Sequence, residues 1–183
     1  MYLVGVAKHV DTIVVGSFEV NCYLVWDDQT KDLLVIDPGD EAISIAGRIN
    51  LSGCSPRAIL LTHAHGDHIA GVAELRSQYQ IPLVAGENER AYLSDPMLNL
   101  SSEIGHPISL APAERWVGDD DVISYGSLAF RVLATPGHTS GGVCYLDEEH
   151  GRLFCGDTIF QGSIGRTDFR GGSFNDLMQS IRQ

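Results

Sequence analysis

Positive charge is scarce in this chain of 183 residues, which has two lysines, Lys8 and Lys31, and 24 acidic against 12 basic side chains. The formal net charge is −12. Nucleic acids and anionic membranes bind proteins through Lys and Arg, which replace the counterions of the phosphates. The sequence shows no cluster of these residues, so we expect neither nucleic acid nor a membrane surface as a partner.

Long apolar runs are missing as well. No stretch reaches the roughly 18 apolar residues that cross a bilayer. Residues 1–10 have no basic start followed by an apolar block and a small-residue cleavage site. This pattern predicts a protein without a signal peptide or membrane span that remains in the cytoplasm.

Cysteine is limited to Cys22, Cys54, Cys144 and Cys155. No two of them form a C-x-x-C pair, which argues against a structural zinc knuckle and against a thioredoxin-type site. Cys144 and Cys155 lie in apolar stretches that are typical of core residues. We expect reduced thiols in a cytoplasmic protein, with a disulfide as the alternative.

Strands and helices recur in two halves of the chain, without an internal repeat or a long linker. Apolar and β-branched segments predict strands at residues 11–15, 20–26, 32–36, 58–61 and 82–85. Helices are predicted at residues 41–50, 69–78 and 87–94. A second β-rich stretch covers residues 122–159. The length suits a single domain over residues 1–183, and the pattern favours two facing sheets with helices outside, an α/β fold.

Two segments leave questions open. Residues 95–112 contain three prolines and several serines without a clear period. They form either a lid or specificity segment, or a packed surface crossover. Residues 175–182 are helix-like with an apolar stripe, and no capping glycine follows before the end of the chain. We therefore expect that the natural protein continues and that the domain is truncated at its C-terminus.

The most informative motif is T-H-A-H-G-D-H at residues 62–68, which follows an apolar run. In an extended segment His63 and His65 point the same way, so they can hold one ion together. The glycine allows a sharp turn, after which Asp67 and His68 can be aimed at a neighbouring point. Imidazole and carboxylate ligands suit zinc, iron or manganese. The motif predicts a metal site at the end of a strand.

Two further motifs also end apolar runs. T-P-G-H-T at residues 135–139 presents His138 from a turn, and C-G-D-T at residues 155–158 presents Asp157. Each is weak alone, because a single His or Asp after a strand is usually an ordinary turn residue. They gain weight because the first motif needs partners.

In order and approximate spacing, these motifs resemble the ligand motifs of the metallo-β-lactamase superfamily. The D-P-G at residues 37–39 and the N-C-Y at residues 21–23 resemble its turn and its opening strand. Residues 160–169, which contain G-R-T-D, are similar to the glyoxalase II-like (hydroxyacylglutathione hydrolase-like) branch and its persulfide dioxygenase relatives. The resemblance implies an αβ/βα four-layer sandwich, with two mixed β-sheets flanked by helices and metals at one edge.

The resemblance also implies a set of ligands. The first metal would be held by His63, His65 and His138, the second by Asp67 and His68, and Asp157 would bridge both. Two Zn²⁺ are expected, with iron or manganese as alternatives. The family has one more His in a C-terminal G-H-G-type segment, whereas the one later histidine here is His150, in the turn at residues 147–151. That ligand lies beyond residue 183, or the second site is incomplete; we expect the former.

The implied activity is that of a zinc-dependent hydrolase, a glyoxalase II-like thioesterase for a small S-acyl thiol such as S-lactoylglutathione. A metal-bridging hydroxide would attack the carbonyl, with Asp67 as the catalytic residue that orients it. No G-x-S-x-G elbow for a serine nucleophile is present. Arg166 is the candidate substrate-binding residue; it binds a substrate carboxylate or pairs with Asp168 to hold its loop, and we favour the pairing.

Two other functions remain as alternatives. One is a persulfide dioxygenase with a single iron held by His63, His138 and Asp157. The other is a non-catalytic metal-binding module that has lost the second site. A β-lactamase is disfavoured because those enzymes are usually exported. The sequence leaves open the acyl group, the thiol, the metal and the oligomeric state.

Overall fold

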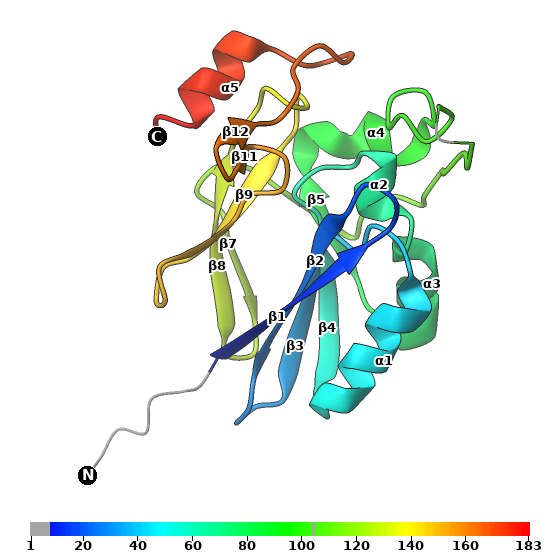
Figure 1. The fold of residues 1–183 in the computed structure, drawn as a ribbon. Helices are drawn as coiled ribbons and strands as arrows, with labels where there is room; N and C mark the ends of the chain where they lie inside the picture. The colour runs from blue at the N-terminus through cyan, green and yellow to red at the C-terminus, as the bar shows by residue number, and fades with distance from the viewer. Residues whose placement is uncertain (1–7, 104) are drawn as a thin grey trace.

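Two facing β-sheets with flanking helices make up the computed structural model, which describes residues 8–103 and 105–183 (Figure 1). The larger sheet contains, in spatial order, β1 (Lys8–Val15), β2 (Val20–Asp27), β3 (Asp32–Ile36), β4 (Ser55–Leu60), β5 (Leu83–Gly86) and β6 (Arg115–Val117). The smaller contains β10 (Arg152–Phe154), β9 (Val143–Asp147), β8 (Leu128–Ala134) and β7 (Val122–Tyr125). A two-stranded ribbon pairs β11 (Ile159–Phe160) with β12 (Ser163–Ile164).

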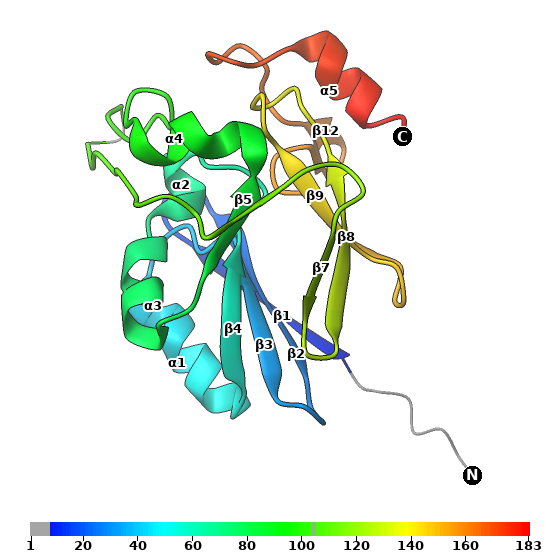
Figure 2. The ribbon, with the colours of Figure 1, turned by 180° about the vertical axis from the view of Figure 1, so that it is seen from behind.

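The helices are α1 (Ala42–Ser52), α2 (Gly66–Ile69), α3 (Val72–Tyr79), the 3₁₀ turn η1 (Glu87–Glu89), α4 (Arg90–Ser94) and α5 (Phe174–Ser180). Figures 1 and 2 show α1 and α3 against the outer face of the larger sheet. Both views place α2, α4, α5 and the β11–β12 ribbon at one common edge. This arrangement agrees with the predicted sandwich.

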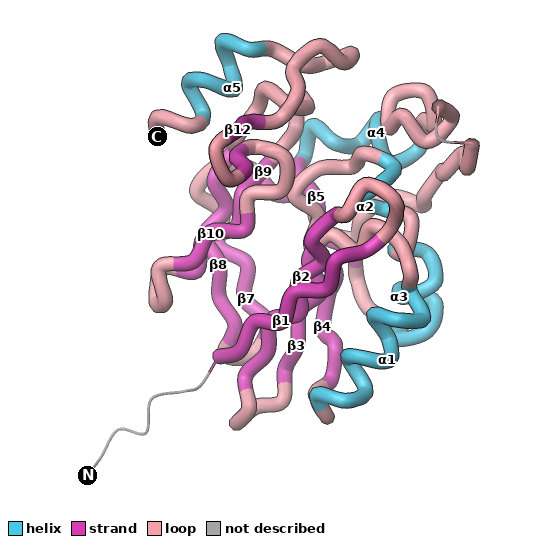
Figure 3. The backbone as a smooth tube through the Cα atoms, viewed as in Figure 1, coloured by secondary structure: helices cyan, strands magenta, loops and turns pink. Residues whose placement is uncertain are grey.

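The direction of the strands explains why many loops lie at one edge of the sheets. In the larger sheet β1, β2 and β3 are antiparallel, whereas β3, β4, β5 and β6 run parallel. Parallel strands end at the same edge, so the segments that follow β3, β4 and β5 meet there. All pairs in the smaller sheet are antiparallel. Figure 3 shows the loops gathered at this edge, around α2 and β12.

The core has two layers because strand side chains alternate between the faces of the sheet. In β3, Leu33 and Val35 pack towards α1 and α3. Leu34 and Ile36 face the other way and pack between the two sheets. The near-continuous apolar sequence of β3 and β4 follows from burial on both faces.

Replacement of Leu60 tests the packing between the two sheets, because the Leu60 side chain is fully buried there. The Leu60→Ala variant is expected to lower the free energy of unfolding by about 2–5 kcal/mol, because it removes buried methyl groups and leaves a cavity. Leu153 is 45% exposed, so Leu153→Ala should change it by less than about 0.5 kcal/mol. Urea unfolding followed by circular dichroism measures both, and equal midpoints for the two variants would contradict the two-layer core.

The predicted helix at residues 69–78 differs from the structure, which has two helices, α2 and α3. The reason is Gly71, whose N–H donates to the carbonyl oxygen of Pro38 at 2.9 Å. A Cβ at this position would lie 2.9 Å from that same oxygen. The turn at residues 37–39 thus packs against the chain where the helix divides, and only glycine leaves room for it. A second difference is β6, a three-residue edge strand that was not predicted.

All four cysteines lie in the described residues as free thiols, as predicted. Cys22, Cys54 and Cys144 are buried, whereas Cys155 is partly exposed and is therefore not the core residue that was predicted. Among the described helices, none combines the length and apolar character needed to traverse a bilayer. The prediction that residues 1–10 contain no signal peptide falls mostly on residues 1–7, which lie outside the described residues.

Candidate metal centre

The loop after β4 carries the first motif and is held by the preceding parallel strand. Asp37, directly after β3, accepts hydrogen bonds from the Thr62 N–H at 2.8 Å and the Thr62 hydroxyl at 2.6 Å. Thr62 Oγ1 lies 3.2 Å from His63 Nδ1. The D-P-G turn therefore fixes the start of the histidine segment, and Thr62 links the turn to the ring of His63.

Four histidine rings converge at this edge of the sheet. The ring centroid of His63 lies 4.8 Å from those of His65 and His138, and 4.1 Å from that of His68. All four side chains belong to residues less than 8% exposed. Candidate ligand atoms of His63, His65 and His138 lie within 4.8 Å of one another. The structure thus assembles the three residues that were predicted to hold one metal.

A second group joins His63 to His68 and Asp157, again with ligand atoms within 4.8 Å of one another. Asp157 Oδ1 lies 3.2 Å from His68 Nε2, and its Oδ2 lies 3.5 Å from His138 Nε2. Asp157 therefore stands between the two groups, as expected of a bridging ligand. Asp67 belongs to neither group and lines the adjoining cavity. Its role as a ligand stays a prediction.

The buried ring nitrogens indicate that these residues fit a metal. Nε2 of His63 and Nε2 of His65 are buried and have no hydrogen-bond partner within the described part of the chain. A buried polar atom without a partner is costly, and an ion held by these nitrogens would remove that cost. Imidazole with one carboxylate is a donor set that suits zinc, iron and manganese.

Burial also keeps two of the rings in the form that binds metals. It lowers the pKa of His63 well below its usual value and that of His65 to about 3, and the neighbouring histidines add to both effects. Burial acts in the same direction on His68, but the carboxylates of Asp37 and Asp157 outweigh it and raise that pKa. Neutral imidazole is the ligand form, so His63 and His65 need lose no proton to bind an ion.

Partners on the opposite side of the rings set their orientation. His138 Nδ1 lies 2.7 Å from the carbonyl oxygen of Arg166, and His68 Nδ1 lies 3.0 Å from Asp37 Oδ2. Such contacts fix the ring and direct the other nitrogen towards the metal. His65 Nδ1 instead lies 2.9 Å from His138 Nε2.

Glu89 is a site residue that sequence reasoning missed. It is fully buried and ties together the two loops that carry the histidines. One carboxylate oxygen accepts the Ala64 N–H at 2.8 Å, while the other accepts the Thr139 hydroxyl at 2.6 Å and the Gly141 N–H at 3.1 Å. Burial raises the pKa of Glu89, and this effect exceeds that of the hydrogen bonds, which lower the pKa. In the sequence Glu89 looks like any polar residue of a short helix, so no signal distinguished it.

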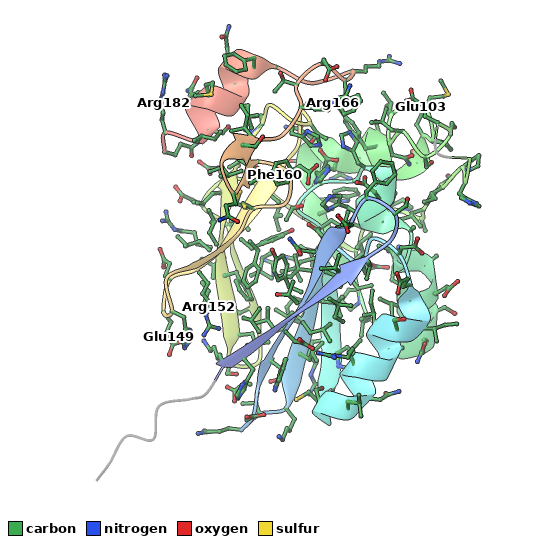
Figure 4. All side chains as sticks on the ribbon, in the orientation of Figure 1. Glu103, Glu149, Arg152, Phe160, Arg166 and Arg182 are labelled. Atoms are coloured by element: carbon green, nitrogen blue, oxygen red, sulfur yellow. The ribbon has the colours of Figure 1, made fainter. Side chains whose placement is uncertain are left out.

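A cavity of about 330 Å³ opens beside the histidines. Its lining residues come from several loops and include Phe18, His65, Asp67, Asn99, Leu100, His138, Asp157, Phe160, Ile164, Arg166 and Phe169. Figure 4 labels Phe160, Arg166 and Glu103, which also lines the cavity, at the edge where the loops meet. Glu149 and Arg152 lie away from it, on the hairpin between β9 and β10.

Arg166 makes the predicted pair with Asp168 through two hydrogen bonds of 2.9 and 2.8 Å. The guanidinium carbon also lies 4.1 Å from the ring centroid of Phe169. Arg166 lines the cavity, so pairing and substrate contact are compatible. Three other histidines lie outside the cluster: His9 pairs with Asp28, His150 pairs with Asp147, and His106 is exposed on the segment between α4 and β6.

Comparison with known proteins agrees with this geometry. The model of the metallo-beta-lactamase superfamily matches residues 15–183. "Probable metallo-hydrolase YqgX" of Bacillus subtilis is 39% identical over 92% of this chain and 80% of that protein. "Hydroxyacylglutathione hydrolase GloC" of Haemophilus influenzae is 32% identical over 95% of this chain and 82% of that protein.

Solved structures show the same fold. The crystal structure of BLEG-1 B3 metallo-beta-lactamase has a TM-score of 0.90 and 38% identity, and covers 96% of this chain and 84% of that one. TTHA1623 in a di-iron-bound form has a TM-score of 0.84 and 31% identity, and covers 94% of this chain and 84% of that one. The chain belongs to the metallo-beta-lactamase superfamily and has its fold. It is a metal-dependent hydrolase with a cluster of metal-binding histidines.

Proposed function

We propose that this protein is a glyoxalase II-like thioesterase that uses two zinc ions to hydrolyse a small S-acyl thiol such as S-lactoylglutathione. The observation that carries the proposal is the pair of ligand groups that share His63 beside a cavity. A relative named for hydroxyacylglutathione hydrolysis supports the thioester as substrate. The chain's G-R-T-D segment supplies Arg166 to the same cavity.

The protein's own residues have distinct roles in this proposal. His63, His65 and His138 would hold one ion, and His68 with Asp157 and Asp67 would hold the other. Bound divalent ions polarise a carbonyl oxygen and lower the pKa of water towards neutrality. Asp67 lines the cavity together with His65 and Asp157, and in this proposal its carboxylate would accept a hydrogen bond from the attacking water.

Binding and orientation of the substrate come from the cavity walls. The apolar side chains there exclude bulk water from the reacting carbonyl, which strengthens electrostatic interactions within the site. Arg166 carries a positive charge, as guanidinium groups do at neutral pH, and its two hydrogen bonds to Asp168 hold it in place. It can contact a substrate oxygen from the cavity rim while keeping its loop in place.

Removal of the metal tests the proposal directly. After dialysis against a chelator, hydrolysis of S-lactoylglutathione is expected to fall below about 1% of the initial rate, because no side chain in the cavity replaces the ions as Lewis acids. Adding two equivalents of Zn²⁺ should restore it. Metal analysis of the protein as isolated gives the number and identity of the ions. Activity that persists in the metal-free protein would contradict the proposal.

The second candidate function is the mononuclear-iron persulfide dioxygenase. It is favoured by the distance of 3.5 Å between His138 Nε2 and Asp157 Oδ2; His63 would complete the set of ligands for one iron. Oxygen uptake with glutathione persulfide, one iron per chain and no thioester turnover would select it. A chromogenic β-lactam belongs in the same assays, because BLEG-1 carries the name of a metallo-beta-lactamase. Absence of turnover with all three substrates would select the non-catalytic metal-binding module.

A further inference from the structure

The segment between β12 and α5 passes over the metal centre. It comprises residues 165–173, which we call the strap (Figure 1). A Cβ at Gly165 would lie 1.8 Å from the carbonyl oxygen of Asp157, so the strap backbone is in direct contact with that candidate ligand. One residue further on, the carbonyl oxygen of Arg166 lies 2.7 Å from His138 Nδ1. The strap therefore touches two residues of the centre, and its backbone sets the orientation of the His138 ring.

The part of the strap between Arg166 and Arg170 is held together by its own contacts. Arg166 makes its two hydrogen bonds to Asp168, and its guanidinium carbon lies 4.1 Å from the ring centroid of Phe169. The Gly172 N–H donates to the carbonyl oxygen of Phe169 at 2.9 Å, which closes a turn. Because these residues are joined to one another, a displacement of Arg170 should also displace Arg166.

Tyr92, a residue of α4, fastens the far end of the strap. Its hydroxyl donates to the carbonyl oxygen of Arg170 at 3.0 Å. The fit is close, because Gly171 has a φ of +86° and a Cβ there would lie 2.0 Å from the Tyr92 hydroxyl oxygen. Tyr92 is buried and does not belong to the cavity lining that the described residues form. Its hydroxyl therefore acts on the strap and not on a bound substrate.

The other contacts of Tyr92 fix the direction of its hydroxyl. The ring centroid lies 6.1 Å from that of His65, with the two rings edge to face. The Tyr92 carbonyl oxygen accepts a hydrogen bond from Asn99 Nδ2 at 2.9 Å. Tyr92 also follows Glu89 by three residues, and the Glu89 carboxylate joins the two histidine loops. One short helical stretch thus contacts all three loops of the centre.

We propose that Tyr92 is a positioning residue of the metal centre. Its hydrogen bond to Arg170 holds the strap, and the Arg166 carbonyl oxygen then keeps His138 Nε2 directed towards the metal. Groups that orient a ligand contribute about 10–100-fold to metal affinity. Tyr92 acts through the strap rather than on His138 itself, so we expect the lower end of this range. The inference concerns metal binding and applies whichever substrate the protein hydrolyses.

Tyr92→Phe is the decisive variant, because it removes the hydroxyl and keeps the ring against His65. The metal-free chain is titrated with Co²⁺, which binds the same nitrogen and oxygen ligands as Zn²⁺ and reports their geometry through its visible absorption. We expect an affinity about tenfold below that of the wild type and an altered spectrum at saturation. Loss of one hydrogen bond should lower Tm by less than about 6 °C. A hydroxyl that served stability alone would lower Tm without changing the spectrum.

Tyr79→Phe is the matched control. The Tyr79 hydroxyl also donates to a backbone carbonyl oxygen, that of Ala46 at 3.4 Å, but this contact joins α3 to α1 away from the metal centre. The control should leave both the affinity for Co²⁺ and the spectrum unchanged.

Gly171→Ala tests the same contact from the strap. The added Cβ would collide with the Tyr92 hydroxyl, so this variant should also lower the affinity for Co²⁺. In the Tyr92→Phe background that oxygen is gone, and the nearest remaining atom of the ring, Cζ, is 3.3 Å away. Strain of alanine at a φ of +86° is present in both backgrounds and cancels from the comparison. The combined variant should therefore lose much less affinity than the product of the two single losses.

Wild-type affinity and spectrum in Tyr92→Phe would overturn the role of Tyr92. Losses that multiply in the combined variant would do the same, because the two residues would then act independently. An equal loss in Tyr79→Phe would show that the effect is not specific to the strap. Should Tyr92→Phe fail to fold, unchanged Co²⁺ binding in Gly171→Ala overturns the proposal, and a tenfold loss supports it. Thioester turnover is not measured here, so failure of the thioesterase proposal leaves this inference intact.

Discussion

Replacement of His63 by alanine is expected to reduce both metal content and hydrolysis more than any other single change. His63 is the residue common to the two ligand groups. Removing a group that merely orients a ligand lowers metal affinity or activity about 10–100-fold. Because His63 belongs to both ligand groups, its removal should lower metal affinity and activity by more than about 100-fold. The fold should persist, because the change removes a buried nitrogen that has no hydrogen-bond partner.

Metal content measured by mass spectrometry, steady-state rates and circular dichroism are the relevant measurements. His9→Ala is the matched control. His9 lies on β1, stacks on Trp26 and pairs with Asp28, away from the metal centre. This control should retain both metals and full activity. If His63→Ala kept its metal and its rate, the assignment of the centre would be wrong.

Loss of the Glu89 carboxylate is expected to damage stability and metal binding together. Glu89→Ala leaves three donors in the two histidine loops without their acceptor. Breaking a buried charged network of this kind costs about 3–5 kcal/mol. For a chain of this size, about 3 kcal/mol corresponds to a fall in Tm of roughly 6–12 °C. The loops would then hold the imidazoles less firmly, so metal affinity should fall as well.

Glu89→Gln separates the charge from the shape of the side chain. Its amide keeps one acceptor oxygen, but its NH₂ must face either the Ala64 N–H or the donors of Thr139 and Gly141. Two donors then oppose each other, so we expect part of the loss. Glu87→Ala serves as the control, because its pair with Arg90 is exposed and worth little. Unchanged Tm and chelator resistance in Glu89→Ala would show that the loops are held by other contacts.

The metal-ligand loops could be predicted because their residues follow one another closely in sequence. His63 and His65 at the end of an apolar strand need only local geometry to point together, and the structure bears this out. His138 and Asp157 were weak signals alone and gained support from their order along the chain. The structure brings both to the cluster, and Asp157 stands between the groups.

Predictions that depended on a distant contact were less successful. The continuous helix over residues 69–78 was wrong because its interruption comes from Pro38, which contacts Gly71 from a distant part of the chain. Glu89 could not be recognised, because its three donors lie on segments separated from it by 25 to 52 residues. The sequence also left open whether residues 95–112 form a lid or a packed surface crossover. The hydrogen bond from Asn99 Nδ2 to the carbonyl oxygen of Tyr92 in α4 forms only when this segment folds back on that helix.

By itself the sequence indicated the class of fold, because periodicity depends on neighbouring residues, and it pointed to the four histidines and Asp157 through short motifs whose order resembles that of a known superfamily. The tertiary structure alone decided which nitrogens are buried without partners, how Asp37 and Glu89 hold the loops, and which residues line the cavity. The physical reason is that burial, hydrogen-bond partners and the approach of two backbones arise when distant segments pack. The order of residues along the chain does not reveal such contacts.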